Sequence, residues 1–344
     1  MFLRPGLQSL FCNAFRPILL LLVLSVAGAV CIQAQTNTQS DPKLVSQIDT
    51  KSIRRTEIEL RNDNDMYLMN MQDQYYTNGL FLNLRKIVDS SKLKPTEKNR
   101  LIEFRLGHEI YNAYTAQIDS LEAVDRPIAG YVFASVGQQH FYNNEQYLSY
   151  SLSLGTIGKR AFGEQLQAGL HNLLNMYHAA GWEFQLQDAW VVDLALDHNL
   201  LLGRTRGQML DVAMHSSVRL GMFQTNVKTG PVFRVGKLSA FDQSAHFNAR
   251  LQSANLKPDK ELYLYYKPEA QLVFYDASMQ GGMFLKDKGP VTVMPKRWQI
   301  SNHFGGVYAN ESITLKIQYF FNTKESTQSL FRHQYGSLSL AYRF

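Results

Sequence analysis

Long segments of this chain alternate apolar and polar side chains with a period of two. Near the C-terminus, Leu315 and Ile317 alternate with Lys316 and Gln318, and the same alternation recurs along most of the sequence. Successive side chains of a β-strand point to opposite faces, so each segment predicts a strand with one apolar and one polar face. The segments run for about 10 to 14 residues, longer than the usual strand of ~5–6 residues but suited to a tilted strand that crosses a membrane.

Twelve such segments can be distinguished, an even number, as bacterial outer-membrane barrels require. Aromatic residues make up 12% of the chain, with 18 Tyr and 20 Phe against 3 Trp, and charged residues make up 19%. This composition disfavours a disordered chain, a bundle of membrane helices and a disulfide scaffold. The predicted strands are 55–63, 75–87, 99–111, 129–142, 145–156, 183–198, 208–221, 225–238, 261–275, 298–309, 312–323 and 333–344.

The same alternation fits two all-β architectures. In a soluble secreted sandwich the apolar faces meet in a core, whereas in an outer-membrane barrel they face lipid. Segment length, aromatic residues near segment ends and a final strand that carries Leu340, Tyr342 and the terminal Phe344 on one face favour the barrel. We therefore predict an all-β fold, a transmembrane antiparallel β-barrel of about 12 strands. Residues 163–180 break the pattern with helical spacing and predict a short helix in a surface loop.

The N-terminus has the pattern of an export signal. Arg4 and Arg16 precede an apolar run from Ile18 to Val30, and a cleavage site fits after Ala34. We predict a signal peptide over 1–34, an N-terminal periplasmic segment over 35–54 and a barrel domain over 55–344. A lipoprotein anchored at Cys31 is a less favoured alternative. Cleavage would remove both cysteines and lower the net charge from +6 to +4, a balance too mild and too dispersed to indicate nucleic-acid binding.

Four polar motifs lie in or beside the connections after the first, third and fifth predicted strands. With short turns and both termini in the periplasm, these connections face the cell surface. The motifs are Asn64-Asp65-Met66-Tyr67, Tyr76-Thr77-Asn78-Gly79, Asp125-Arg126-Pro127-Ile128-Ala129-Gly130, and Gly163-Glu164-Gln165-Leu166-Gln167 followed by His171 and Gly181-Trp182-Glu183-Phe184-Gln185. In this order they resemble the outer-membrane lipid A 3′-O-deacylases, which show N-D-x-F, Y-T-[NA]-G, D-R-P-Y-A-G and G-x-Q-x-Q…H…G-W-x-x-Q segments. The motifs cover about residues 55 to 190, and beyond them the resemblance is the strand count.

The resemblance implies an outer-membrane, Ca²⁺-dependent ester hydrolase that removes the 3′-linked acyloxyacyl group of lipid A. His171 matches the catalytic histidine, which implies a general base that activates water; an imidazole suits this because its unperturbed pKa lies near neutrality. Asn64 and Asp65 match the N-D pair, which is part of the site in the family. Their oxygens suit Ca²⁺, an ion able to stabilise the oxyanion formed on ester attack. Thr77 matches the hydroxyl residue that would orient water or substrate.

Plainer interpretations accompany these assignments. The Asn62-Asp63-Asn64-Asp65 stretch also suits a simple turn, and its doubled Asn-Asp leaves the register of the motif open. We favour Asn64-Asp65 because Tyr67 then supplies the aromatic residue of the motif. Thr77 can equally be a threonine at the start of a strand, and most of the nine histidines must be ordinary ones.

Arg126 and Gln165 are the predicted substrate-binding residues. Arg126 can hold a lipid A phosphate bidentately, although an internal Asp–Arg pair fits equally well. Gln165 can bond to sugar or to buried backbone. The chain also departs from a family member in two places. No Lys or Arg lies between Asn112 and Ile118, where that member has a basic pair, and Tyr177 stands in place of an acidic residue, for which Glu164 and Glu183 are candidate replacements.

Two other classes of function stay open beside the deacylase. One is a non-enzymatic barrel, either a pore or a structural protein, and the other is an outer-membrane phospholipase. A pore would spread polar residues around all strands, whereas the motifs here gather at three connections, which favours an enzyme. The expected partners are lipid A or lipopolysaccharide of the outer leaflet and the outer membrane itself, with the protein acting as a monomer.

Overall fold

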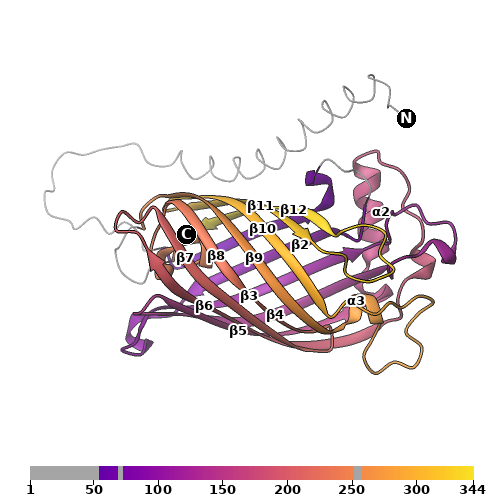
Figure 1. The fold of residues 1–344 in the computed structure, drawn as a ribbon, viewed down its shortest axis with the longest axis horizontal. Helices are drawn as coiled ribbons and strands as arrows, with labels where there is room; N and C mark the ends of the chain where they lie inside the picture. Colours follow the sequence, from indigo (N-terminus) through magenta and orange to yellow (C-terminus); the bar gives the residue numbers. More distant parts are fainter. Residues whose placement is uncertain (1–53, 69–72, 252–257) are drawn as a thin grey trace, which may run out of the picture. The chain divides into compact units, whose positions relative to one another are not determined.

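The computed structural model describes residues 54–68, 73–251 and 258–344, which form one closed barrel of twelve antiparallel strands (Figure 1). Each strand pairs with its neighbours in sequence, and the first strand pairs with the last, with Ile58 opposite Tyr342. The predicted barrel is therefore confirmed, and a two-sheet sandwich is excluded. The predicted signal peptide over 1–34 lies outside the described residues, as does nearly all of the 35–54 segment.

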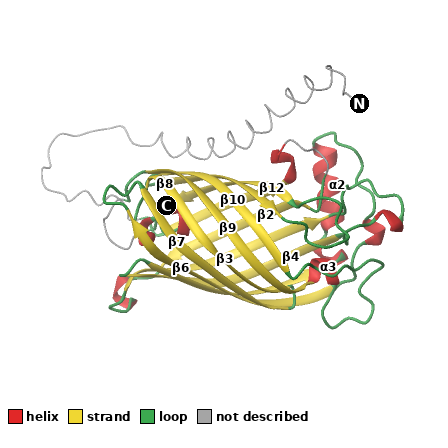
Figure 2. Cartoon of the chain, viewed as in Figure 1, coloured by secondary structure: helices red, strands yellow, loops and turns green. Residues whose placement is uncertain are grey.

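Twelve strands and several short helices make up the described chain (Figure 2). The strands are β1 (Thr56–Asn64), β2 (Tyr76–Ile87), β3 (Glu97–Tyr111), β4 (Ala129–Tyr142), β5 (Gln146–Ile157), β6 (Ala189–Arg204), β7 (Leu210–Gly221), β8 (Gln224–Lys237), β9 (Glu261–Asp276), β10 (Trp298–Ala309), β11 (Ile313–Asn322) and β12 (Gln334–Arg343). The α-helices are α2 (Gly163–Leu173) and α3 (Ala277–Gln280). The 3₁₀ helices are η1 (Asp65–Leu68), η2 (Ser90–Lys92), η3 (Leu121–Ala123), η4 (Lys159–Ala161), η5 (Trp182–Phe184), η6 (Phe241–Gln243) and η7 (Ala245–Phe247). In the described part of the chain, no helix has the length and apolar character needed to cross a bilayer.

The period-two alternation sorts side chains between the outside and the lumen. On β3, Phe104 and Leu106 are 52% and 58% exposed and face outward. Inside the barrel the side chain of Arg85 is buried and ion-paired with three glutamates: Glu57 at 2.8 Å, Glu59 at 2.5 Å and Glu103 at 2.5 Å. A buried guanidinium requires such partners, because an unpaired charge in the interior is strongly destabilising. The apolar exterior and the charged, paired interior are those of a barrel in lipid.

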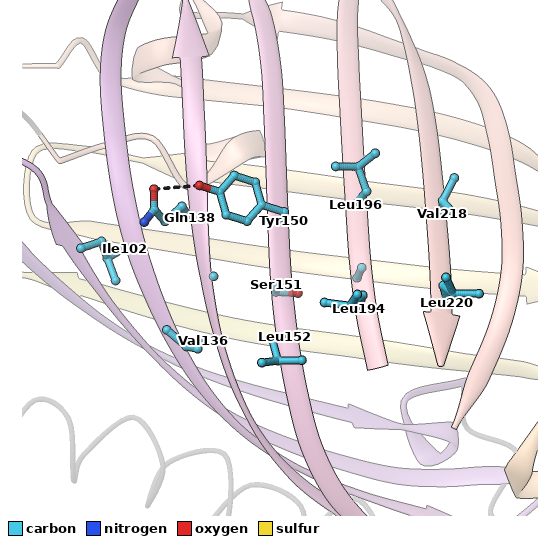
Figure 3. A pocket seen from close by; sticks show the side chains of 12 residues that line it. Ile102, Val136, Gln138, Tyr150, Ser151, Leu152, Leu194, Leu196, Val218 and Leu220 are labelled. Carbon is cyan, nitrogen blue, oxygen red and sulfur yellow. Dashed lines mark hydrogen bonds between the residues drawn. The ribbon is translucent and has the colours of Figure 1, made fainter. Parts of the chain in front are cut away.

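A shallow apolar depression of about 570 Å³ lies on the outer wall where β3 to β7 run side by side (Figure 3). Leu152, Leu194 and Leu220 line it and are 47%, 55% and 62% exposed. The hydroxyl of Tyr150 donates to Gln138 at 3.0 Å at its edge. Because its lining belongs to the outward face of the strands, this depression is part of the membrane-facing surface.

The sequence prediction gives wrong bounds for two elements. The sixth strand, predicted over 183–198, runs from Ala189 to Arg204, because Trp182–Phe184 form the turn η5 instead. Trp182 is buried with Ile110 and Ile128, and a buried aromatic in a loop gives the same local pattern as the start of a strand. The helix predicted over 163–180 ends at Leu173.

The first residue of β1, Thr56, and the last residue of β12, Arg343, lie at the same end of the barrel. In outer-membrane proteins this end faces the periplasm. The connection between β8 and β9 lies at this end, and its residues 238–251 fold back against the strands. Phe241 and Phe247 pack in one cluster with Leu101 of β3. We call residues 238–251 the periplasmic plug. The expectation that all turns at this end are short is therefore wrong for the β8–β9 connection.

Candidate active site

The β1–β2 connection and the helix α2 meet at the opposite end of the barrel, where Figure 1 shows α2 and α3. His171, in the last turn of α2, is 5% exposed and lies against Asp73 of the β1–β2 connection. Its Nε2 is 3.0 Å from Oδ2 of Asp73, and its Nδ1 is 2.7 Å from the carbonyl oxygen of Tyr177. The Tyr177 hydroxyl donates to the same Oδ2 of Asp73. The predicted general base is thus held on both ring nitrogens.

These contacts shift the acidity of the histidine. Burial alone lowers the pKa of His171, but its hydrogen bonds to Asp73 and to the Tyr177 carbonyl, and the negative charges of Asp73 and Asp65, raise the pKa above its ordinary value. A carbonyl oxygen only accepts hydrogen bonds, so Nδ1 carries a proton. The remaining nitrogen, Nε2, is the one that can exchange a proton.

Asp65, the first residue of η1, is 4% exposed and shares this neighbourhood. Its Oδ2 accepts from the backbone N–H of Gln74 at 2.5 Å, which ties it to the residue after Asp73. Burial and the nearby charge of Asp73 raise the pKa of Asp65 to about 8. Asp63, the other aspartate of the doubled motif, lies within β1 and pairs with Arg61 at 3.3 Å. The geometry therefore favours the Asn64-Asp65 register.

Asn64 and Thr77 lie nearby in the chain but have other contacts. Oδ1 of Asn64 accepts from the backbone N–H of Met66 at 2.8 Å, the simple turn allowed by the sequence. Thr77 is 1% exposed at the start of β2, and its Oγ1 accepts from Nδ2 of Asn112 at 3.3 Å. Within the described ranges, no hydrogen bond joins Thr77 to His171. The predicted roles of Asn64 and Thr77 stay predictions.

The glycines and the tryptophan of the motifs hold α2 against the barrel rim. A Cβ on Gly163, the first residue of α2, would lie 2.6 Å from the ring of Trp182 and 2.9 Å from Cα of Gly130 in β4. The indole N–H of Trp182 donates to Oε1 of Gln167 at 2.9 Å. Gln167 precedes His171 by one helical turn, so the contact fixes the helical face that carries the histidine. Two of the motifs, one with Gly130 and the other with Gly163, Gln167 and Trp182, therefore form one packing unit.

Arg126, the predicted substrate-binding residue, has internal partners in the structure. Its side chain is 1% exposed, and its Nε lies 3.0 Å from Oε2 of Glu325 in the β11–β12 connection. Its other nitrogens donate to Ser278 of α3 at 2.9 Å and to the carbonyl of Pro127 at 3.3 Å. With all three nitrogens occupied, the guanidinium joins surface connections and has no fork free for a phosphate. The sequence allowed an internal Asp–Arg ion pair. Arg126 does form an internal ion pair, but with Glu325 instead of an aspartate.

Gln165 is exposed on α2, while Gln167 faces the barrel with His171. Because Gln165 precedes His171 by six positions, it lies on a different side of the helix, and the structure does not bring it to the His171–Asp73 pair. Glu164 and Glu183, the candidate replacements for the missing acid, are also exposed. The carboxylate beside the histidine is Asp73, which the sequence reading did not assign. Its only sequence signal is its position four residues before Thr77 in a motif-bearing loop.

Asp65 has an oxygen without a hydrogen bond to the described residues. This Oδ1 atom is buried. A hard cation would bond to that oxygen and screen the repulsion between Asp65 and Asp73, so the donors present fit Ca²⁺. Among the residues described, no three His, Cys, Asp or Glu side chains cluster in a metal-binding arrangement. Further ligands would have to be amide or backbone oxygens, water or substrate.

Comparison with known proteins identifies the family to which this chain belongs. The family model for outer membrane protein LpxR matches residues 18–344. LpxR from Salmonella typhimurium has a similar structure, with a TM-score of 0.67 and 16% sequence identity, covering 84% of this chain and 100% of that one. The search of curated proteins found no match.

Two autotransporter barrels are similar at lower scores. The β domain of the Bordetella autotransporter Brka has a TM-score of 0.44 at 10% identity and covers 85% of this chain and 99% of its own. The translocator domain of NalP from Neisseria meningitidis has a TM-score of 0.41 at 9% identity and covers 86% and 90%. The Salmonella structure supports the twelve-stranded fold, and the family model spans nearly the whole sequence. The chain therefore belongs to the LpxR family of outer-membrane proteins, the lipid A deacylases that its motifs resemble.

Proposed function

We propose that this protein hydrolyses the 3′-linked acyloxyacyl ester of lipid A, with His171 as general base, water as nucleophile and Ca²⁺ held by Asp65 and Asn64. The observation that carries the proposal is the buried His171 at the surface end of the barrel, with Nδ1 fixed by a carbonyl at 2.7 Å and Asp73 beside Nε2. A histidine whose one nitrogen is a fixed donor has its other nitrogen set for proton transfer. Family membership supplies the substrate class.

In the proposed reaction, a water gives a proton to the His171 imidazole while its oxygen attacks the ester carbonyl carbon. A base placed in this way accelerates hydrolysis by roughly 10²–10⁴-fold. Thr77 is proposed to orient the water or the substrate. When bound, Ca²⁺ would supply positive charge for the oxyanion that forms on the carbonyl.

Mass spectrometry of lipid A tests the activity. Cells that express the wild type should lose the 3′ acyloxyacyl group, and His171→Ala or His171→Gln should lower the rate by at least about a hundredfold. Heat-dependent mobility in detergent verifies that each variant forms the barrel. Intact lipid A with the wild type, or unchanged turnover in the His171 variants, would contradict the proposal.

The role of Ca²⁺ can be tested by measuring hydrolysis and, separately, by measuring the stability of the folded protein. Chelation should abolish hydrolysis, added Ca²⁺ should restore it, and Mg²⁺ should substitute poorly because it demands stricter geometry and keeps its waters. Ca²⁺ should also raise the unfolding temperature of the wild type, since a ligand that binds only the folded state stabilises it. Asp65→Asn should lose this shift. Full activity in chelator would remove Ca²⁺ from the mechanism.

The alternatives predict different measurements. The periplasmic plug and the lumenal ion pairs of Arg85 disfavour an open pore, so the protein in planar bilayers should show no stable conducting state. A phospholipase with a serine nucleophile would need a serine on His171; among the described residues the partners of His171 are Asp73 and Tyr177. Release of fatty acid from phospholipid vesicles, without change to lipid A, would favour that alternative.

A further inference from the structure

One row of outward-facing side chains on β6, β7 and β8 is polar, although the wall around it is apolar. His198 of β6 lies opposite Ser216 of β7, and Ser216 lies opposite Thr229 of β8. Residues directly opposite in an antiparallel pair share one face of the sheet. Leu196 and Val218, each two positions along on that face, are 44% and 41% exposed, so the row points outward as they do. We call His198, Ser216 and Thr229 the polar row.

The polar row lies near the middle of the wall and not at either rim. Ser216 is six positions from one end of β7 and five from the other, and His198 is nine and six positions from the ends of β6. The middle of a membrane-spanning strand lies in the hydrocarbon core. Polar side chains that face lipid there are costly, and they are kept where they serve a function. The polar row therefore needs a surface that covers it.

The hydrogen bonds of the polar row leave part of it unpaired. Thr229 donates its hydroxyl to the carbonyl of His215 at 3.0 Å, so Ser216 is the donor in the 3.2 Å bond between the two hydroxyls. Among the described residues, nothing donates to the Ser216 oxygen and no partner bonds to the ring of His198. A neutral imidazole has one donor and one acceptor. The unpaired groups of the row are thus of both kinds.

The backbone beside the polar row is also incompletely paired. The β8–β9 ladder breaks after the pair of Thr229 with Ala270 and resumes at Phe233. Pro231 of β8 and Pro268 of β9 lie in this interval, and proline has no N–H to donate. Proline is rare inside a sheet for this reason, and a backbone group without a partner is costly in lipid. A protein surface packed against this wall would exclude lipid from both the row and the break.

We propose that the outer wall of β6, β7 and β8 is the contact face between two copies of this chain in the outer membrane (Figure 1). A two-fold contact brings a patch against its own copy, so the patch must carry both donors and acceptors. The imidazole N–H of His198 in one copy can donate to Ser216 in the other, and symmetry supplies the same bond in reverse. Because the row has no Asp, Glu, Lys or Arg, it suits a copy of itself better than a charged partner.

The shallow apolar depression on the outer wall reaches the polar row. Leu196 and Val218, two positions from His198 and Ser216, belong to its lining (Figure 3). Apolar contact alone gives little association in lipid, because lipid chains are equally apolar, so close packing and hydrogen bonds decide. The depression admits side chains of a second barrel beside the row, and the row supplies the hydrogen bonds. This inference goes beyond the proposed hydrolysis and does not depend on it.

Cysteine cross-linking in native outer membranes tests the contact face. Ser216→Cys places a thiol in the row, and Leu60→Cys is the matched control at the middle of β1, six strands away around the ring of twelve and 40% exposed. The wild type, whose cysteines are Cys12 and Cys31, gives the background. On oxidation with copper phenanthroline, the Ser216→Cys chain should form a disulfide-linked species of twice its mass, while Leu60→Cys should stay at background.

The strength of association gives a second test. The combined variant His198→Leu, Ser216→Ala and Thr229→Val removes the polar row. Energy transfer between labelled chains in lipid vesicles should show a dimer dissociation constant raised at least about tenfold, because the hydrogen bonds made in lipid are lost. The free energy of unfolding of the dilute monomer should not fall, since the variant removes polar groups from the lipid face. That measurement separates a lost contact from a misfolded barrel.

Three results would overturn the inference. The first is cross-linking of Ser216→Cys that is no stronger than that of Leu60→Cys, which would restore the monomer expected from the sequence. The second is an unchanged dissociation constant in the combined variant. The third is a cross-linked product whose second component is a different protein. All three concern association alone, so a failure of the proposed hydrolysis is a separate result, measured on lipid A.

Discussion

Both ends of the barrel bury charged side chains, and two of these sites, Arg234–Asp211 at one end and Asp65–Asp73 at the other, differ in how completely their contacts are made. At the periplasmic end, Arg234 of β8 donates from Nε and Nη2 to the two oxygens of Asp211 at 2.9 and 2.6 Å. Its third nitrogen donates to Ser244 of the periplasmic plug at 2.8 Å. At the surface end, the charge of Asp73 helps to raise the pKa of Asp65, and among the described residues Oδ1 of Asp65 has no hydrogen-bond partner.

This difference separates charges that serve the fold from charges that serve chemistry. A bidentate guanidinium–carboxylate pair offsets its own desolvation when its remaining protons and lone pairs are bonded. Two neighbouring carboxylates with an unfilled oxygen do the opposite, and proteins keep such arrangements at functional sites. The Arg234–Asp211 pair therefore stabilises the folded barrel, while the Asp65–Asp73 pair stores unfavourable electrostatics that a cation or a proton can relieve.

The largest expected effect lies at the plug end. Asp211→Ala leaves Arg234 buried without its carboxylate and should lower the free energy of unfolding by about 3–5 kcal/mol. Urea unfolding in lipid vesicles, followed by mobility in detergent, measures this change. Replacing both residues with apolar side chains of similar volume should restore much of the stability. Equal stability of Asp211→Ala and the wild type would end the contrast drawn between the two ends.

The second-largest effect is expected where α2 packs against the rim of the barrel. Gly163→Ala places a methyl group 2.6 Å from the Trp182 ring and should destabilise the packing of α2 by about 1–3 kcal/mol. Hydrolysis should fall, because His171 moves away from Asp73, while the barrel remains assembled. Gly169→Ala is the matched control on the same helix, since nothing lies within 4 Å of a Cβ there. If both variants hydrolyse lipid A equally well, the motif glycines do not hold the site.

A smaller change of opposite sign should occur at Asp65. Asp65→Asn removes the repulsion from Asp73, so in chelator we expect a gain in unfolding free energy on the order of 1 kcal/mol, although Ca²⁺ stabilisation is lost. The same unfolding measurement, with and without Ca²⁺, provides both values. A loss of several kcal/mol in chelator would mean that Asp65, like Asp211, belongs to the folding framework.

The smallest effect is expected for an exposed ion pair at the surface end. Arg160 lies 3.5 Å from Asp188, and their side chains are 63% and 32% exposed. Solvent screens this pair, so Arg160→Ala should change stability by less than about 1 kcal/mol. Its unfolding curve sets the baseline against which the Asp211 and Asp65 variants are compared. A change as large as that of Asp211→Ala would show that burial is not what distinguishes these charges.

Most of the fold could be predicted because strand periodicity is local. The alternation of Leu315 and Ile317 with Lys316 and Gln318 follows from the pleat alone, and the structure places the first two at 46% and 51% exposure on the outer wall. The errors of the sequence prediction lie in the connections between strands, where the period-two alternation does not apply. Trp182 and Phe241 are buried aromatics in connections, and the plug depends on contacts with strands distant in sequence.

The sequence by itself determined the strand order, the lipid-facing side chains and the motif that contains His171, since each is encoded in neighbouring residues. Only the tertiary structure decided that Asp73 faces this histidine and that Gln167 rather than Gln165 lies toward the barrel. It also decided that Arg126 forms an ion pair with Glu325. The physical reason is that these contacts join connections whose paths are set by closure of the barrel and by packing at its rim. A side chain in a connection has no periodic rule to fix its direction, so its partner appears only when the chain is folded.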